Sequence, residues 1–355
     1  MYFFVCEKAG YDWIKVAQPD LFDLTPAIIT ARNDAQLQQF FSRYVFRLLE
    51  PGEARPRAIA PTPLAAPSPR LLEHVRGQLL GRSGDVPALR VVLGFVTYNN
   101  DAGDLRLAIE AAEQALRQAS LAEGTAIFLV DNGEASHAML PDGLLRRFDS
   151  QGNVGFGAAH NRLMQEAFSG GADLYVAVNP DGLLHPNAVA ELVRMSHANG
   201  GAALVEALQF PMEHPKPFEA DTFDTPWVSG ACLAIPRRIH DAIGGFDDAF
   251  FMYCEDVDLS WRARAAGFAL KTCPTALFLH AVTNRGTNRN TVRMIYESGV
   301  ILARKWGAPN FEEWLRTEFD AMGLQMPRST PITVPLEWRP YAEFGHHFSF
   351  AKARW

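Results

Sequence analysis

The sequence predicts an α/β protein built on a mixed, mostly parallel sheet between helices. From about residue 86 onward, short apolar runs alternate with helical patterns, which is typical of α/β folds. Three of these runs end in clusters of Asn, Asp and Gly, at residues 97–100, 131–133 and 179–182. Ligands of parallel α/β sheets bind beyond the carboxyl ends of the strands. Tight turns favour the same residue types, but three clusters in succession indicate a nucleotide-type site.

The expected elements follow one another in a regular order. Residues 90–96 are rich in β-branched side chains and predict the first strand, and apolar residues spaced three and four apart over 105–119 predict a helix. Residues 126–130 and 174–178 predict two further strands. Between them, a glycine-rich stretch opens a helix over 152–168, which two glycines terminate.

The chain divides into four parts. Residues 1–50 form an accessory segment, in which apolar residues at helical spacing over 37–49 predict an amphipathic helix. Residues 51–85 are dense in Pro and Ala and predict an extended linker with a short helix. Residues 86–306 carry the α/β pattern, and 307–355 form a helical and aromatic tail.

The composition excludes several classes of protein. The chain has 355 residues and a formal net charge of −7, which excludes a nucleic-acid binder that works by neutralising phosphates. Its four cysteines show no CxxC spacing, so neither a zinc site nor a disulfide framework is expected. No apolar run approaches the roughly 20 residues of a membrane helix, and the apolar start is too short for a signal peptide. We therefore expect a cytoplasmic protein with at most peripheral membrane contact.

Seven features of the sequence resemble a known family. They are VTYNN at 96–100, VDNG at 130–133, NVGFGAAHN at 153–161, VNPDG at 178–182, WVSGACLAIPR at 227–237, GGFDDAFFMYCEDVDLSWRARAAGF at 244–268, and His280. In this order and spacing they resemble family 2 glycosyltransferases, inverting enzymes of the GT-A fold, and in particular the bacterial rhamnosyltransferase-like branch. The resemblance covers roughly residues 90–306 and makes 86–306 the catalytic domain.

The resemblance implies a GT-A (Rossmann-like) fold and the transfer of a sugar from a nucleotide-sugar donor. The donor would be dTDP-rhamnose or a UDP-hexose, and the acceptor a hydroxyl of a bacterial surface glycan or its lipid-linked precursor. A divalent cation, Mn²⁺ or Mg²⁺, would hold the diphosphate. In a net acidic protein, a cation and a few basic groups are what can stabilise that leaving group.

The donor site is predicted at the strand ends. Asp131 can accept a hydrogen bond from the ring N–H of uracil or thymine, which cytosine lacks, and this favours a UDP or dTDP donor. The resemblance places the glycine loop and Asn161 beside the donor, although His160 stands where the family usually has Asn. Arg285 or Arg289 is a candidate clamp for the diphosphate, with a solvated loop as the alternative. The predicted donor contacts are Thr97, Tyr98, Asn99, Asp131, Asn153, Gly155, Asn161, Asn179, Asp181 and Arg285.

Asp181 and His280 are the predicted metal ligands. Mg²⁺ and Mn²⁺ prefer oxygen ligands, and Mn²⁺ also accepts imidazole. Both residues are expected at strand ends on one edge, and the resemblance places them together at the metal. Asn179 stands where the DXD form of the family has Asp, so only one carboxylate is left to bind the ion. A protein that does not need the metal is therefore an open alternative. The resemblance implies that Asn179 faces the ribose or a metal-bound water.

Glu255 and Asp256 are the predicted catalytic pair. Inversion by direct displacement needs a carboxylate that takes the proton of the acceptor hydroxyl. By resemblance Asp256 is this base, and Glu255 orients the acceptor or supports the loop. The alternative is that these acids only complement the dipole of the helix they begin. By resemblance, the sugar and acceptor pocket is lined by Trp227, Ser229 and Gly230, although a Trp is as readily part of a core.

Other functions and partners stay open for parts of the chain. A non-catalytic subunit that binds nucleotide-sugars is the main alternative, because Asn179 and His160 depart from the family pattern. A sugar nucleotidyltransferase is disfavoured, since residues 96–101 lack the Gly-rich loop with Arg and Lys that its chemistry needs. The aromatic and basic tail would lie at a membrane interface, on the catalytic domain, or against a second subunit of a homo-oligomer.

Overall fold

The computed structural model describes the α/β region and its C-terminal extension. It describes the two short strands 3–7 and 45–49 and residues 86–133, 140, 143–210, 216, 218–219, 222–280, 289–345, 348 and 350.

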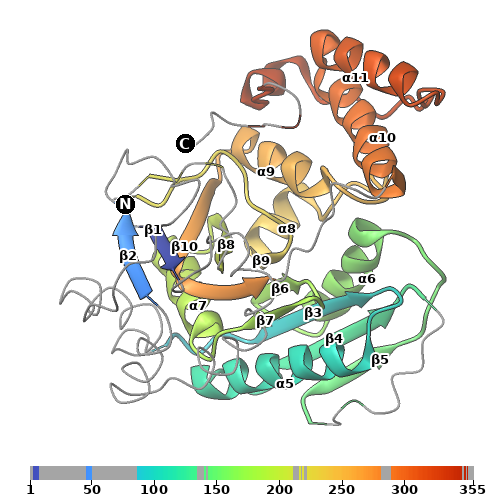
Figure 1. The fold of residues 1–355 in the computed structure, drawn as a ribbon. Coiled ribbons are helices and arrows are strands. Elements are labelled where there is room, and N and C mark those ends of the chain that lie inside the picture. Colours follow the sequence, from blue (N-terminus) through green and yellow to red (C-terminus); the bar gives the residue numbers. More distant parts are fainter. Residues whose placement is uncertain are drawn as a thin grey trace.

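One eight-stranded mixed sheet forms the centre of the molecule (Figure 1). The pairs β3·β4, β3·β6, β4·β5 and β8·β10 are parallel, whereas β6·β9, β8·β9 and β7·β10 are antiparallel. The predicted mixed, mostly parallel sheet is therefore confirmed. In spatial order the strands are β5 (Leu145–Phe148), β4 (Ala126–Asp131), β3 (Val91–Thr97), β6 (Leu174–Val178), β9 (Cys232–Pro236), β8 (Ala203–Phe210), β10 (Ala269–His280) and β7 (Gly182–Leu184).

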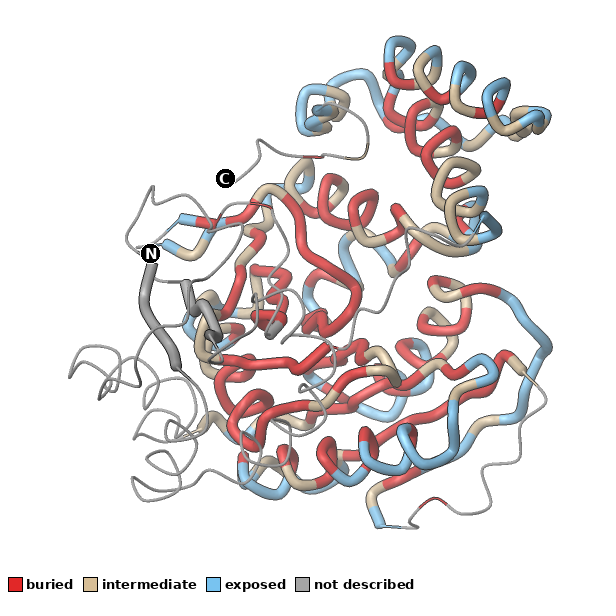
Figure 2. The backbone as a smooth tube through the Cα atoms, viewed as in Figure 1, coloured by how far each residue is buried: buried red, intermediate tan, exposed pale blue. Residues whose placement is uncertain are grey.

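Helices cover both faces of this sheet. On one face, α5 (Ala102–Ala119) and α7 (Ala188–Ala198) bury their apolar sides in one core cluster. On the other face, α6 (Phe156–Ser169), α8 (Arg237–Ile243) and α9 (Glu255–Ala265) contribute to a second cluster. The central strands between them are buried along nearly their whole length (Figure 2). These strands are near-continuous apolar runs because both of their faces are covered.

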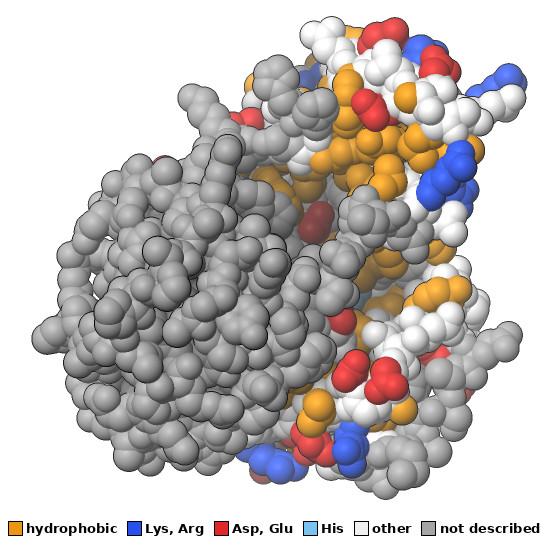
Figure 3. Space-filling model, in the orientation of Figure 1, with side chains coloured by type: hydrophobic (Ala, Val, Ile, Leu, Met, Phe, Trp, Pro, Cys, Tyr) orange, Lys and Arg blue, Asp and Glu red, His pale blue; other side chains and the backbone are white. Residues whose placement is uncertain are grey.

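A third cluster joins the C-terminal extension to α9. Helices α10 (Arg289–Trp306) and α11 (Pro309–Ala321) and the 3₁₀ helix η2 (Leu336–Tyr341) follow the sheet. Apolar side chains gather over α10 and α11 on the face shown in Figure 3. Trp261 of α9 packs edge-on against Trp306, Phe344 and Phe350, with ring centroids 5.0–5.7 Å apart. The aromatic tail thus packs on helix α9 of the α/β region, and packing on this region was one of the three interpretations left open.

The N-terminal segment differs from the prediction where the structure describes it. Residues 45–49 were expected to end an amphipathic helix, but they form strand β2 (Val45–Leu49), which pairs antiparallel with β1 (Phe3–Glu7). Val and Phe favour strands, and a partner some 40 residues away can override a local helical period. The rest of the predicted helix and the linker 51–85 lie outside the described residues. Among the helices that the structure describes, none is long and apolar enough to cross a membrane.

The sheet brings the predicted site residues to one edge. Strands β3, β4 and β6 are parallel, so Thr97 and Asp131, which end β3 and β4, and Asn179, which follows β6, lie on the same side. Strand β9 runs the opposite way, with Cys232 opposite Val178, so the residues just before it lie at this edge as well. The polar clusters found in the sequence therefore converge, as predicted.

Candidate active site

Asp181 and His280 meet at this edge, as predicted. Asp181 lies in the turn after β6, and the next residue, Gly182, pairs directly with His280 across β7 and β10. Asp181 Oδ1 lies 3.1 Å from His280 Nε2. The imidazole is 3% exposed and the carboxylate 37% exposed, so the ring is buried while the carboxylate reaches solvent.

This pair fits a divalent cation. Asp181 Oδ1 and His280 Nε2 lie 3.1 Å apart, so one carboxylate oxygen and one imidazole nitrogen would be able to hold the same cation. Among the residues that the structure describes, no third His, Cys, Asp or Glu completes a metal cluster. Oxygens of a substrate diphosphate and water would therefore supply the remaining positions. The residues suit Mn²⁺, which accepts both a carboxylate and an imidazole.

Asn179 contacts the imidazole. Its Nδ2 lies 3.4 Å from His280 Nε2, and its backbone N–H donates to the carbonyl of Ala231 at 2.8 Å. Asn179 therefore lies beside His280, one of the two predicted metal ligands. Its contact with the ribose stays a prediction.

The ends of β3 and β4 are joined by buried hydrogen bonds. Thr97 Oγ1 donates to Asp131 Oδ1 at 2.7 Å, and the N–H of Asn132 donates to the carbonyl of Thr97 at 2.7 Å. Tyr98 and Asn99 follow, with Tyr98 54% exposed and Asn99 in the left-handed region at φ 54°. A fixed carboxylate beside an exposed aromatic ring suits the recognition of a pyrimidine, which stays a prediction for these four residues.

The glycine loop packs against the loop that precedes α9. Gly155 has φ 89°, and a Cβ there would lie 2.2 Å from the carbonyl oxygen of Phe251. The same carbonyl accepts from the N–H of Phe156 at 2.9 Å. The loop is held from within by Asn153, whose Oδ1 accepts from the N–H of Gly155 at 3.2 Å. Gly155 is therefore required by the close approach of two backbones, whatever contact the loop makes with phosphate.

Asn161 fastens this region from the other side. Its Nδ2 donates to the carbonyl of Phe246 and to Asp248 Oδ1, both at 2.8 Å, and its Oδ1 accepts from the N–H of Phe246 at 2.8 Å. Both the NH₂ group and the oxygen of this amide therefore bind other groups of the protein. The geometry therefore favours a role in holding the 246–248 loop over the direct donor contact that was predicted.

His160 is part of the core. It is fully buried, its Nδ1 lies 2.7 Å from Tyr175 Oη, and the ring of Phe156 packs on it with centroids 4.3 Å apart. Burial lowers its pKa to about 3, so the imidazole is neutral. His160, which stands where the family usually has Asn, is therefore a packing residue in this structure.

Asp256 is held in a fixed position at the start of α9. Its Oδ2 accepts from the N–H of Gly230 at 2.9 Å and its Oδ1 from the N–H of Val257 at 2.8 Å. The side chain is half-buried. Burial raises its pKa above the usual range, against the lowering effect of the two N–H donors and of Lys216. A fixed carboxylate with a raised pKa suits a general base.

Glu255 differs from its neighbour. It is 6% exposed, and its Oε2 has no hydrogen-bond partner among the described residues. Burial, and then the charge of Asp256, raise its pKa well above the usual range. Burial therefore favours the neutral form of Glu255, which fits support of the loop better than a charged role.

The backbone is strained just before this pair. Tyr253 and Cys254, neither of them glycine, lie in the left-handed region at φ 72° and 64°. Such strain persists only where the surroundings impose it and concentrates at functional sites. Here it turns the chain sharply into α9 and brings Glu255 and Asp256 onto its first turn.

A buried ion pair supports the segment that holds Asp256. Glu206 of β8 accepts from the ammonium of Lys216, and its Oε2 accepts from the N–H of Ser229 at 2.6 Å. Lys216 also donates to the carbonyl of Trp227 at 2.7 Å. Ser229 is followed by Gly230, whose N–H holds Asp256. The ion pair therefore fixes the position of the predicted acceptor pocket.

Trp227 lies in the C-terminal core cluster. It is 7% exposed, and its ring packs between the ammonium of Lys216, at 5.0 Å, and the ring of Phe350, at 6.5 Å. This supports the core interpretation, and a contact with sugar stays a prediction.

The two candidate arginines have different outcomes. Arg285 lies outside the described residues. Arg289 opens α10, and its Nη2 donates to the carbonyl of Met322 at 2.7 Å, beyond the end of α11. The guanidinium of Arg289 is thus tied to the C-terminal helices.

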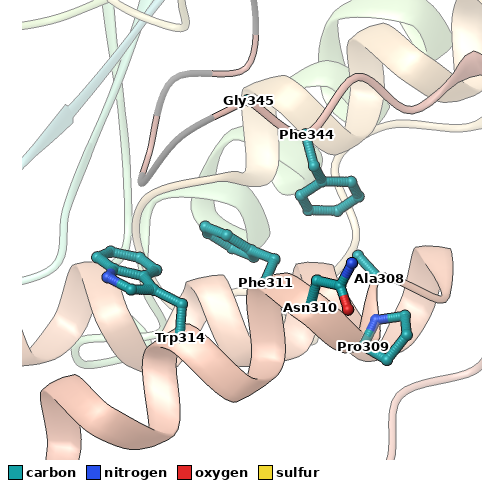
Figure 4. Close-up of a pocket in the computed structure, with 7 residues that line it drawn as sticks. All are labelled: Ala308, Pro309, Asn310, Phe311, Trp314, Phe344 and Gly345. Carbon is teal, nitrogen blue, oxygen red and sulfur yellow. The ribbon is translucent and has the colours of Figure 1, made fainter.

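A separate pocket of about 510 Å³ lies in the C-terminal extension (Figure 4). None of its lining residues belongs to the predicted donor, metal or catalytic sites. It is lined by Ala308, Pro309, Asn310, Phe311, Trp314, Phe344 and Gly345.

Three residues of the site were missed by the sequence analysis. Glu206, Gln209 and Lys216 lie on β8 or shortly after it, and no motif marks them. A Glu and a Gln within an otherwise apolar run over 203–210 were the available signal, since a polar residue in a buried strand needs a partner.

Comparisons with known proteins show what the chain is similar to. No family model matches the chain. The sequence is 46% identical over 54 residues to an N-acetylglucosaminyl-diphospho-decaprenol L-rhamnosyltransferase of Mycobacterium tuberculosis, a match covering 15% of this chain and 18% of that protein. It is 35% identical over 54 residues to the rhamnosyltransferase WbbL of Escherichia coli, covering 15% of this chain and 20% of that protein. The matches thus span about a fifth of these relatives' length.

The fold has a solved counterpart. A crystal structure of GalNAc-T7 with UDP, GalNAc and Mn²⁺ superposes with a TM-score of 0.51 at 14% sequence identity, covering 66% of this chain and 52% of that one. The chain therefore has the GT-A glycosyltransferase fold. Within that class it is similar to family 2, and its curated relatives are rhamnosyltransferases, as the motifs predicted.

Proposed function

We propose that this chain is an inverting glycosyltransferase that moves a sugar from a nucleotide diphosphate donor to a hydroxyl of a glycan or lipid-linked acceptor. The observation that carries the proposal is the pairing of two groups at one sheet edge. Asp181 and His280 form a pair that fits a cation, and Asp256 is a fixed, half-buried carboxylate on a neighbouring segment. The first suits a leaving diphosphate, and the second suits an incoming hydroxyl.

In the proposed reaction, the acceptor oxygen attacks the anomeric carbon as the bond from that carbon to the phosphate oxygen breaks. Asp256 takes the hydroxyl proton, and the nucleoside diphosphate leaves with the bonding electron pair, which inverts the anomeric centre. Mn²⁺ or Mg²⁺ on Asp181 and His280 would neutralise the charge that develops on the diphosphate. Thr97, Tyr98, Asn99 and Asp131 would hold the nucleoside.

The donor is proposed to be dTDP-rhamnose, with a UDP-hexose as the second choice. The two curated relatives are rhamnosyltransferases, and the name of one specifies an N-acetylglucosaminyl-diphospho-decaprenol acceptor. By analogy, a polyprenyl-diphosphate-linked sugar is the first acceptor to test. Asp131, as an acceptor for the imide N–H, is compatible with both thymine and uracil.

The test is release of nucleoside diphosphate from dTDP-rhamnose and UDP-hexoses, with Mn²⁺ or with EDTA. We expect turnover that needs the cation and is lost in Asp181→Ala. Formation of nucleoside triphosphate and sugar 1-phosphate when inorganic pyrophosphate is added to the donor would instead indicate a nucleotidyltransferase. Binding of donor without release, in the presence of acceptor, would indicate the non-catalytic subunit.

A further inference from the structure

Gln209 connects the metal pair to the segment that holds the base. It ends β8 together with Phe210 and is 8% exposed. Its Oε1 lies 2.9 Å from His280 Nδ1, and its Nε2 donates to Ser229 Oγ at 3.1 Å. Ser229 is the residue before Gly230, whose N–H holds Asp256.

The two amide contacts of His280 favour a proton on Nδ1, whereas its contact with Asp181 Oδ1 at 3.1 Å favours a proton on Nε2. An amide oxygen only accepts, so Gln209 Oε1 requires the proton on Nδ1. At the other ring nitrogen, Asn179 Nδ2 presents an N–H at 3.4 Å, which suits a lone pair on Nε2. The amides on both sides of the ring thus agree on the same tautomer.

This tautomer turns two acceptors toward each other. With the proton on Nδ1, the Nε2 lone pair faces Asp181 Oδ1 at 3.1 Å. Two facing acceptors repel unless a cation lies between them. With the proton on Nε2 instead, His280 would donate to Asp181, and a cation would have to displace that hydrogen bond.

We propose that Gln209 is a positioning residue that holds His280 in the Nδ1–H tautomer and so makes Nε2 available to a divalent cation. This inference rests on the proposed function for the presence of the cation. Partners that fix a ligating histidine through its second nitrogen typically change metal affinity 10- to 100-fold. Gln209 reaches Nδ1 from β8, so it does this without occupying a coordination position.

The experiment compares wild-type protein with Gln209→Leu, Gln209→Asn and Gln209→Glu. Leu removes the acceptor at similar size, Asn withdraws the amide by one methylene, and Glu keeps an acceptor at Nδ1 and can accept from the hydroxyl of Ser229. The matched control is Thr272→Val. Thr272 Oγ1 donates to Glu206 at 2.5 Å, so this variant also loses a buried hydrogen bond between β8 and β10 without contacting His280.

Two measurements are made on the full chain. The first is the tautomer of His280 in metal-free protein, from long-range ¹H–¹⁵N NMR spectra of ¹⁵N-histidine-labelled samples, assigned with His280→Gln. The second is Mn²⁺ affinity, from the electron paramagnetic resonance signal of free Mn²⁺ during titration in the presence of dTDP.

We expect the Nδ1–H tautomer in wild-type protein, in Gln209→Glu and in Thr272→Val. Gln209→Leu and Gln209→Asn should shift to the Nε2–H tautomer and bind Mn²⁺ 10- to 100-fold more weakly. If Gln209→Leu does not fold, Gln209→Asn and the wild-type spectrum decide. An Nε2–H tautomer in wild-type protein, an unchanged tautomer in the folded Leu or Asn variant, or a full Mn²⁺ loss in Thr272→Val would overturn the proposal. Failure of wild-type protein to bind Mn²⁺, with the tautomer as expected, would instead refute the metal of the proposed function.

Discussion

Replacing Asp256 with Asn separates the chemistry of this carboxylate from its structural role. The carboxylate accepts from two backbone N–H groups, of Gly230 at 2.9 Å and of Val257 at 2.8 Å, one on each oxygen. Asn offers a single acceptor oxygen, so one of these N–H groups would face an NH₂ group. We expect Asp256→Asn to lower the free energy of unfolding by about 1–3 kcal/mol. Loss of the base should lower kcat by roughly 10²- to 10⁴-fold, or about 3–5 kcal/mol in the barrier.

A matched control distinguishes the two effects. Glu113 of α5 also accepts on both oxygens, from the N–H of Leu144 at 3.0 Å and from Arg117 at 2.8 Å, and neither partner is a predicted site residue. Glu113→Gln should lower stability by a similar amount while kcat for nucleoside diphosphate release stays within threefold of wild type. The measurements are denaturant unfolding and steady-state turnover. A folded Asp256→Asn variant whose kcat matches that of Glu113→Gln would refute the assignment of the base.

Three further predictions concern buried groups. Glu255 has a raised pKa in the folded chain, so its contribution to stability is lost as pH rises from about 4.5 through the folded pKa. Glu255→Gln should flatten the pH dependence of the free energy of unfolding over this range. An unchanged pH dependence would contradict a raised pKa of Glu255. His160 has a lowered pKa of about 3 against 6.5 when unfolded, so stability is lost as pH falls below about 6.5. This loss should reach about 2 kcal/mol between pH 7 and pH 5 and should be absent in His160→Gln, as followed by urea unfolding at each pH. Phe350→Ala should lower the free energy of unfolding by about 3–5 kcal/mol, because this buried ring contacts Trp261; a loss below 1 kcal/mol would mean that the tail does not pack on α9 in solution.

The sequence predicted the sheet edge well because its information there is local. Asp131 follows an apolar run that can only be a buried strand, and strand ends of a parallel sheet meet whatever the loops do. Asp181 and His280 are 99 residues apart in the chain, yet both could be placed at one edge by this argument. The helical spacing of the residues that follow it placed Asp256 in the first turn of a helix, where it lies.

The remainder depends on contacts that no local pattern contains. Gln209 and Glu206 acquire their roles from partners on other strands, so periodicity could not identify them. The strand over residues 45–49 was mistaken for a helix because its pairing partner lies at the other end of the segment. Asn161 and Trp227 illustrate the converse problem. A residue can belong to a motif and lie near a site, yet its side-chain contacts serve to hold a loop or to pack a core.

Helix α9 links the candidate active site to the C-terminal extension. Its first turn carries Asp256, while its buried side carries Asp258, whose carboxylate binds Arg262, Lys305 and the indole N–H of Trp306. The resemblance inferred from the sequence motifs was expected to end at Trp306, yet Phe350 still packs on the same helix. A chain cut at residue 306 would therefore divide a hydrophobic core. In this protein, the position where the resemblance was expected to end, residue 306, is therefore not a boundary of the folding unit.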